Sequence, residues 1–70
     1  MTKTEKVRIH LVEKGNITTW EAIQLYGATR LSAIIYNLRH KYDMNIENEK
    51  VDFTDRFGSK AYYVKYIYRG

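Results

Sequence analysis

The sequence predicts an α+β domain in which three helices precede a C-terminal antiparallel β-hairpin. Three observations support this class. Apolar residues recur at helical spacing up to about residue 44, alternation with a period of two begins at Ile46, and glycines stand where helices should end. Because the 70 residues contain no proline, no internal repeat and no linker, we expect a single domain over residues 1–70.

The first helix is predicted over about residues 4–14, where the glycine that follows is a common left-handed stop. Val7 and Leu11 are spaced to share one helix face. Ile9 and Val12 fall on another face. We therefore expect this helix to be apolar on two sides and to pack against both a helical core and a sheet.

The second helix is predicted over about residues 19–26. Thr18 followed by Glu21 is the pattern of a capping box, in which the hydroxyl and the carboxylate each bind a backbone amide of the helix start. Ile17, just before the cap, is placed as a hydrophobic staple. Gly27 should close the helix. The residues expected to point inward are Ala22, Ile23 and Tyr26.

The third helix is predicted over about residues 30–41, with Thr29 as its cap. Its apolar positions follow helical spacing without a break: Leu31, Ile34, Ile35 and Leu38. At about 100° per residue, the opposite side carries Ala33, Tyr36, Asn37 and His40, flanked by Arg30 and Ser32. Only Gly27 and Ala28 separate this helix from the second. Two helices joined by so short a turn form a helix-turn-helix.

The hairpin is predicted from strands at about residues 46–54 and 60–68, which are rich in aromatic and β-branched residues. The segment between them supplies the Asp, Gly and Ser of a turn. A hairpin alone is marginal in water, so its apolar side should pack onto the helices. Phe57 at the turn is expected to fold back onto the sheet. A hairpin after a helix-turn-helix forms a wing.

The segment GNITTWEAIQLYGATRLSAIIYNLRHKYDMNIENEKV resembles a family of small winged helix-turn-helix domains common in bacteriophages and mobile elements. The motifs that carry the resemblance are GNIT, EAIQLYG, TRLSA and NLR, in this order and spacing. The resemblance implies DNA binding in phage regulation or recombination, and a location in the bacterial host cytoplasm. Two positions depart from the family pattern. Members often carry a basic residue where this chain has Ile34, and Asp where it has Asn37.

The charge of the chain favours a polyanionic partner. The net charge is +4 and the pI about 9.4. Residues 43–55 hold five acids and one base, a local net of −4, whereas the rest holds eleven bases and three acids, a net of +8. We therefore expect a basic side that faces double-stranded DNA and an acidic side that does not.

The polar side of the third helix is the predicted base-reading surface, because the second helix of such a motif enters the major groove. Arg30 can bridge guanine O6 and N7, and Asn37 can pair with adenine N6 and N7. A solvated helix face is the alternative, but the hairpin, the short turn and the lack of acids favour DNA. The predicted base contacts are Arg30, Ser32, Ala33, Tyr36, Asn37 and His40.

Phosphate contacts are predicted at the helix starts, after the base-reading surface and at the wing tip. These residues are Thr19, Thr29, Arg39, Lys41, Arg56 and Lys60. Arg39 has an alternative role, which is an ion pair with Asp43. Because one small domain covers few base pairs, we expect a homodimer or multimer on DNA.

Enzymatic and metal-binding functions are not expected. The chain has no cysteine, and its histidines, His10 and His40, belong to different predicted helices, so we expect no metal site and no cofactor. It has no glycine-rich phosphate loop and no apolar run that would form a membrane helix. The alternative function is a protein-binding module, an inhibitor or adaptor, that contacts a host or phage protein through the acidic residues 43–55 and exposed aromatic side chains.

Overall fold

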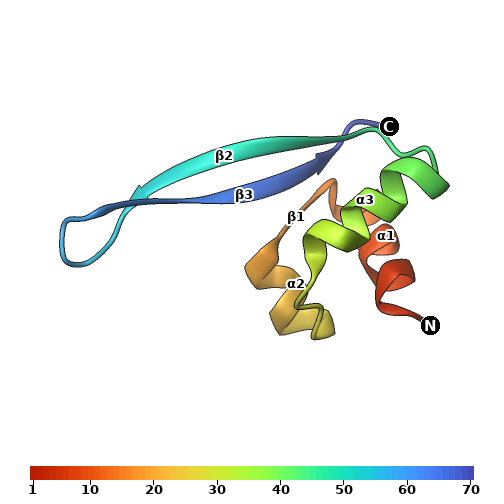
Figure 1. Ribbon diagram of the computed structural model, residues 1–70, viewed down its shortest axis with the longest axis horizontal. Coiled ribbons are helices and arrows are strands. Elements are labelled where there is room, and N and C mark those ends of the chain that lie inside the picture. The colour runs from red at the N-terminus through yellow and green to blue at the C-terminus, as the bar shows by residue number, and fades with distance from the viewer.

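The computed structural model describes residues 1–70 and combines three helices with one three-stranded sheet (Figure 1). The elements are α1 (Lys3–Lys14), β1 (Asn16–Thr18), α2 (Thr19–Tyr26), α3 (Leu31–Lys41), β2 (Ile46–Thr54) and β3 (Lys60–Tyr68). β2 and β3 form the C-terminal antiparallel hairpin, which is the wing. The predicted α+β winged helix-turn-helix class is therefore confirmed.

α1 is capped at both ends. Thr2 accepts a hydrogen bond from the Glu5 amide at 3.2 Å, and Gly15 adopts a left-handed φ of 84°. Val7 and Leu11 are fully buried, but Val12 is exposed, so the expectation of two apolar sides is wrong at Val12. α1 contacts β1 and β3 of the sheet, and the Gly15 carbonyl that follows the helix accepts from the Tyr68 amide, but Val12 lies outside these contacts.

β1 is an element that the sequence pattern did not predict. Its three residues pair antiparallel with β3, and Ile17 lies opposite Tyr66. Ile17 is fully buried, so it belongs to the sheet and the core, in addition to preceding the α2 cap. Three residues are too few to show an alternating pattern, and the partner strand lies at the other end of the chain.

α2 begins with the predicted capping box. The Glu21 amide donates to the Thr18 hydroxyl at 3.2 Å, and the Glu21 carboxylate accepts from the Thr18 amide at 3.0 Å. Of the three residues expected to point inward, Ala22 is buried and Tyr26 is half-buried, but Ile23 is exposed. This two-turn helix contacts α1 and β1, and Ile23 lies outside the core that these contacts form.

α3 follows a short turn in which Gly27 is left-handed and Ala28 is buried. The helix begins at Leu31, and Arg30 is its N-cap residue, with φ −120° and ψ 54° and no side-chain cap. The expectation that Thr29 caps this helix is therefore wrong. The inner face of α3 is fixed in the core through Leu31, Ile35 and Leu38.

A buried polar contact joins α1 to α2. His10 is almost fully buried, and its Nδ1 lies 2.7 Å from the Tyr26 hydroxyl. The two rings meet edge to face, with centroids 5.6 Å apart. This contact fixes the C-terminal end of α2, from which the turn to α3 departs.

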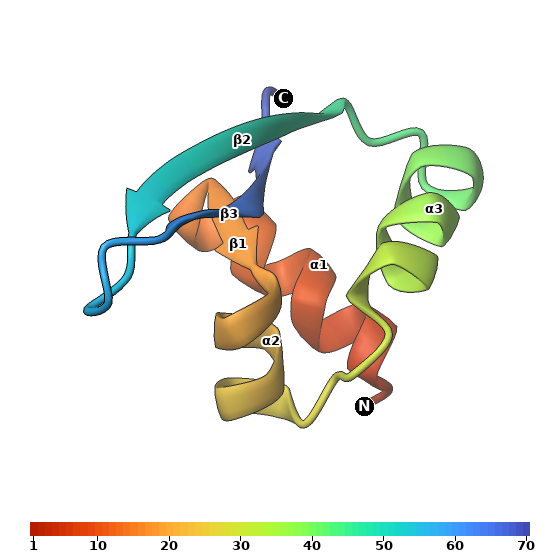
Figure 2. The ribbon, with the colours of Figure 1, turned by 60° about the vertical axis from the view of Figure 1, so that its left-hand side comes forward.

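The sheet has the order β1-β3-β2, and only its base packs on the helices. Ile46 is buried, and Tyr66 and Tyr68 pack partly buried against the core. The outer half of the wing extends beyond the helices (Figures 1 and 2), and the molecule measures 40 × 23 × 20 Å. The expected packing of the hairpin therefore holds only at its base. Phe57, expected on the sheet, lies at the tip with 85% of its surface exposed.

Candidate nucleic-acid interface

The outer face of α3 is the most distinctive polar surface of the domain. The six predicted base-contact residues are all solvent-exposed: Arg30, Ser32, Ala33, Tyr36, Asn37 and His40. No acidic residue interrupts the stretch from Arg30 to Lys41. Figure 2 shows α3 at the edge of the domain, with its outer side uncovered by any other element. One face of the helix is therefore held in the core while the other is available to a partner.

Two aromatic side chains on this face contact each other. Tyr36 and His40 are one turn apart, and their ring centroids are 4.2 Å apart with planes inclined by 42°. Such a pair restricts the rotamers of both side chains before any partner binds. The C-terminal half of the exposed face is consequently a preformed aromatic surface next to Asn37.

Arg30 lies at the beginning of the helix that would enter a groove. Its N-cap position puts it at the end of α3 from which helix-turn-helix proteins contact base edges. It is exposed, and no ion pair involves its guanidinium. An unpaired arginine at this place can form the bidentate contact that guanine offers.

The two threonines predicted to contact phosphate occupy different environments. Thr19 is the first residue of α2 and is exposed, while Thr18 already caps the helix. Thr19 therefore keeps a hydroxyl available beside the positive end of the helix. Thr29 is also exposed but lies in the turn before α3, two residues before the first helical residue.

Arg39 has a structural role that the sequence did not reveal. Its Nε and Nη2 donate to the Ile46 carbonyl at 3.0 and 2.7 Å, and Nη2 also donates to Asn48 Oδ1. Neither of the predicted roles, a phosphate contact or an ion pair with Asp43, matches these contacts. The guanidinium instead links the C-terminal end of α3 to the first residues of β2 by hydrogen bonds. These bonds help to fix the direction in which the wing extends from the helices.

Replacing Arg39 with lysine should loosen the base of the wing. An ammonium group cannot reproduce the planar fork that holds Ile46 and Asn48, and hydrogen bonds from a charged donor contribute about 1.5–3 kcal/mol each. We expect a lower free energy of unfolding and faster amide exchange at the start of β2. Lys41→Met, at an exposed neighbouring position, is the control and should change neither. Equal exchange in both variants would show that Arg39 does not anchor the wing.

The tip of the wing carries the remaining predicted cations. Arg56 and Lys60 are exposed, and the Arg56 guanidinium lies 5.6 Å from the Phe57 ring centre. Asp55 accepts hydrogen bonds from the Phe57 and Ser59 amides at 2.9 and 3.0 Å. The carboxylate is thus occupied in building the turn.

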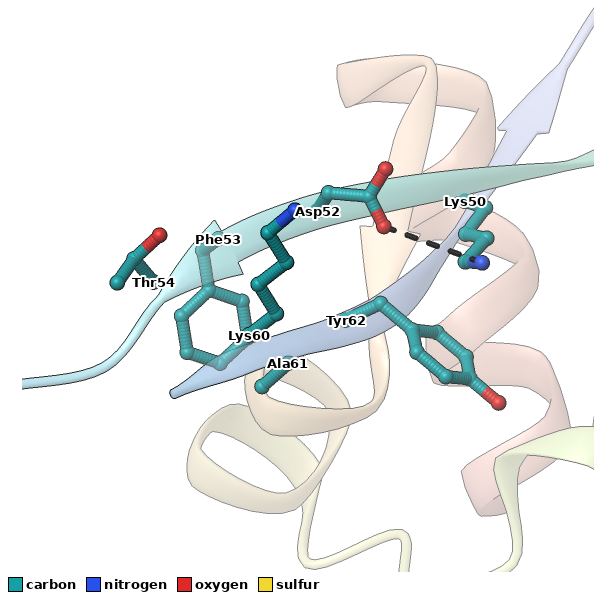
Figure 3. A pocket seen from close by; sticks show the side chains of 7 residues that line it. All are labelled: Lys50, Asp52, Phe53, Thr54, Lys60, Ala61 and Tyr62. Atoms are coloured by element: carbon teal, nitrogen blue, oxygen red, sulfur yellow. Dashed lines mark ion pairs between the residues drawn. The ribbon is translucent and has the colours of Figure 1, made fainter. Parts of the chain in front are cut away.

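One face of the wing holds further candidates that sequence analysis missed. The register places Lys50 opposite Val64 and Asp52 opposite Tyr62, so these side chains share the face of Lys60. Lys50 Nζ lies 4.6 Å from the Tyr62 ring centre and 3.9 Å from Asp52 (Figure 3). The sequence places Lys50 within the acidic segment 43–55. Its spacing of two residues from Asp52 is the only sequence signal that both side chains share one face of the strand.

The acids of β2 are divided between its two faces. Ile46 is buried against the helices, so residues at even positions of β2 point to the helical side of the sheet. Glu47 and Glu49 point to the other side, where Glu47 binds Arg69 at 3.1 Å. Glu47 and Glu49 therefore face away from the helices, whereas Asp52 lies on the helical side with Lys50 and Lys60. Both faces of the wing thus carry charges of both signs.

A helix-turn-helix whose second helix exposes a polar face, followed by a hairpin wing, defines a DNA-binding class of protein. The family model for the winged helix-turn-helix domain matches residues 2–67, and the chain belongs to that family. Domains of this class are DNA-binding folds and are typically not enzymes. Neither a curated protein nor a solved structure matches the chain significantly. None of the helices has the length and hydrophobicity needed to cross a membrane.

Proposed function

We propose that this domain binds double-stranded DNA sequence-specifically by inserting α3 into the major groove. The observation that carries the proposal is the outer face of α3, which exposes Arg30 and Asn37 among six candidate contacts and contains no acid. Arginine and asparagine form bidentate contacts with guanine and adenine. The core contacts of Leu31, Ile35 and Leu38 hold this face rigidly outward.

Phosphate contacts would position the helix in the groove. The candidates with available side chains are Thr19, Thr29, Lys41, Arg56 and Lys60, to which the wing face adds Lys50 and Tyr62. These contacts carry no sequence information, but they fix the register of the protein on the duplex. Arg39 is left out of this set because its guanidinium is already bound within the domain.

The biological role that we propose is transcriptional regulation or assistance in recombination, encoded by a bacteriophage or mobile element and exerted in a bacterial host. The motifs shared with small phage winged helix-turn-helix domains support this role. A domain of this size supplies one reading helix, so regulation requires repeated or symmetric sites.

Fluorescence anisotropy with a labelled duplex, titrated at several salt concentrations, tests the proposal. Binding through about four phosphates should give a log–log slope near −3.6, because each neutralised phosphate contributes about −0.9. Selection from a random duplex library should then yield a preferred site. Absence of binding at low salt would reject DNA as the partner.

Lys60→Ala separates phosphate contacts from base contacts. Lys60 is exposed on the wing, so its removal should weaken binding to all sequences alike and flatten the salt slope by about 1. Glu13→Ala, at an exposed position of α1, is the matched control and should leave the slope unchanged. A loss confined to the preferred sequence would instead place Lys60 at a base edge.

A protein-binding module remains the second candidate function. The observation that favours it is the exposed aromatic surface of Trp20, Phe53, Tyr62 and Tyr63 around one groove. Salt distinguishes the two functions, since an aromatic protein contact should respond little to ionic strength, whereas DNA binding should weaken steeply.

A further inference from the structure

The outer edge of β3 is open along half of its length. β1 pairs with β3 only from Lys65 to Ile67, because the chain turns into α2 after Thr18. From Lys60 to Val64, β3 pairs with β2 on one side and with no strand on the other. An unpaired edge of this kind is a template for another strand.

Two backbone hydrogen bonds establish which residues point to this open edge. The Tyr68 amide donates to Gly15, on the β1 side, and the Arg69 amide donates to Asn45, on the β2 side. The backbone N–H and C=O groups of alternate residues point to opposite sides of an antiparallel strand. In β3, those of the even-numbered residues therefore point to the β1 side, which is the open edge beyond Lys65. Lys60, Tyr62 and Val64 therefore present their backbone amides and carbonyls along the open edge.

A groove of about 760 Å³ lies where β1 ends and the open edge begins. Trp20 of α2 and Tyr62 and Tyr63 of β3 line it, together with Phe53 of β2. Trp20 has 65% of its surface exposed. The groove is therefore an aromatic surface that the chain itself does not cover.

Phe57 is the most exposed large hydrophobic side chain of the domain and stands at the tip of the wing. Its amide donates to Asp55 and its ring lies near Arg56, so the turn is ordered while the ring stays in water. An aromatic ring at the tip of a wing and an aromatic groove at its base are complementary features, which one chain cannot bring together.

We propose that two copies of the chain associate through their wings, with β3 pairing antiparallel to β3 of the second copy. Tyr62 lies opposite Tyr62 of the partner subunit, and Lys60 of each copy lies opposite Val64 of the other. β1 of each copy occupies the edge from Lys65 onward, so the turn at the tip of the other wing leaves the edge at that point. It bends over the sheet, and Phe57 seats in the groove beside Trp20. The occupant of both the edge and the groove is a second copy of this chain.

The edge is self-complementary in this register. All three outward residues find partners, and each pair in such a ladder exchanges two hydrogen bonds, which gives about six in total. The lysines do not oppose each other, because Lys60 faces Val64. The outer edge of β2 is less suited to pairing with itself, since acids such as Glu47 and Glu49 flank it.

The exposed aromatic side chains offer most of the area that a dimer interface needs. The five side chains involved, Trp20, Phe53, Phe57, Tyr62 and Tyr63, are 43% to 85% exposed. At roughly 200 Å² for each aromatic side chain, these rings can bury at most about 600 Å² per copy, to which the backbone edge adds. A standard interface buries about 800 Å² per partner.

The two-fold axis that relates the two copies would be perpendicular to the joined sheet. Both α3 helices would therefore lie on the same side of that sheet.

Sedimentation velocity of the DNA-free protein over a range of concentrations tests the proposal, and Trp20 provides a second signal. It is the only tryptophan, so its emission should shift to the blue as the dimer forms. Phe57→Ala should raise the dissociation constant at least about tenfold, as expected for an aromatic anchor. Val12→Ala, at an exposed position of α1, is the control and should leave association unchanged.

Tyr62→Pro tests the backbone edge directly. It removes an amide that points outward and spares the ladder to β2, which is where proline is tolerated in an edge strand. We expect a folded monomer, checked by circular dichroism. If this variant fails to fold, Phe57→Ala and the cross-linking described below still test whether the wings form the dimer interface.

Cross-linking tests the register, because the chain has no cysteine of its own. Tyr62→Cys places two thiols directly opposite, at a Cα separation near 5.5 Å, within the range of a disulfide. Val64→Cys places them four residues apart along the strand, so it should not cross-link under the same mild oxidation. A monomer at every concentration, a dimer unaffected by Phe57→Ala, or equal cross-linking of both variants would each overturn the proposal. None of these outcomes depends on whether the domain binds DNA.

Discussion

Arg30→Ala is expected to remove the preference of this domain for its selected DNA site. Arg30 is the exposed N-cap of α3, and a bidentate contact to guanine discriminates against a wrong base by about 1–3 kcal/mol. The change should therefore weaken binding to the preferred duplex by about 5- to 150-fold. Binding to unrelated duplexes should fall much less. Competition anisotropy with the selected and a scrambled duplex measures the ratio directly.

The matched control is Arg56→Ala, which removes the same exposed side chain from the wing tip. It should weaken both duplexes to a similar extent, because phosphate contacts are not sequence-specific. Asn37→Ala should act like Arg30→Ala, at a different base. If Arg30→Ala kept the full preference while Arg56→Ala lost it, the wing and not α3 would read the sequence.

Ile17→Ala is expected to have the largest effect on folding. Ile17 is fully buried and links β1 to the core opposite Tyr66. Truncation of a buried isoleucine costs about 2–5 kcal/mol. A domain of this length has a total stability of roughly 4–10 kcal/mol, at 0.05–0.15 kcal/mol per residue. Urea denaturation followed by circular dichroism should show a much lower midpoint, or an unfolded protein at the low end of that range.

Val12→Ala is the control for this prediction, since it truncates a β-branched residue that is 57% exposed. Its stability should stay within about 0.5 kcal/mol of the parent protein. A small effect of Ile17→Ala would mean that β1 contributes little to the core. Ile17 would then serve chiefly as the staple before α2, which is the role its sequence position suggests.

The local features of the site were predictable from the sequence. The α2 capping box of Thr18 and Glu21 depends on residues three positions apart, and both of its hydrogen bonds are present. The buried stripe of α3 and its exposed polar face follow from helical periodicity, which depends only on the spacing of apolar and polar residues within the segment. The six candidate base contacts could be named for this reason, although their contacts with DNA stay a prediction.

The errors that affect the wing lie where distant segments meet, whereas the error at Thr29 is local. Arg39 was assigned to phosphate or to Asp43, but it binds the Ile46 carbonyl and Asn48, because the turn after α3 brings β2 back against the helix end. Phe57 was assigned to the sheet, but the wing extends beyond the helices and offers it no surface there. Thr29 matched the residue preferences of a cap, yet the backbone places Arg30 at that position.

The sequence by itself determined the order of the three helices and the hairpin, the capping box of α2 and the face that α3 exposes, because each depends on residues within a few positions of one another. The tertiary structure alone decided that Asn16–Thr18 is a strand, that it covers only part of the β3 edge, and that Trp20 lies beside the open remainder. The physical reason is that backbone pairing between distant strands depends on where the packed helices place them. A three-residue strand carries too little pattern of its own to specify a partner.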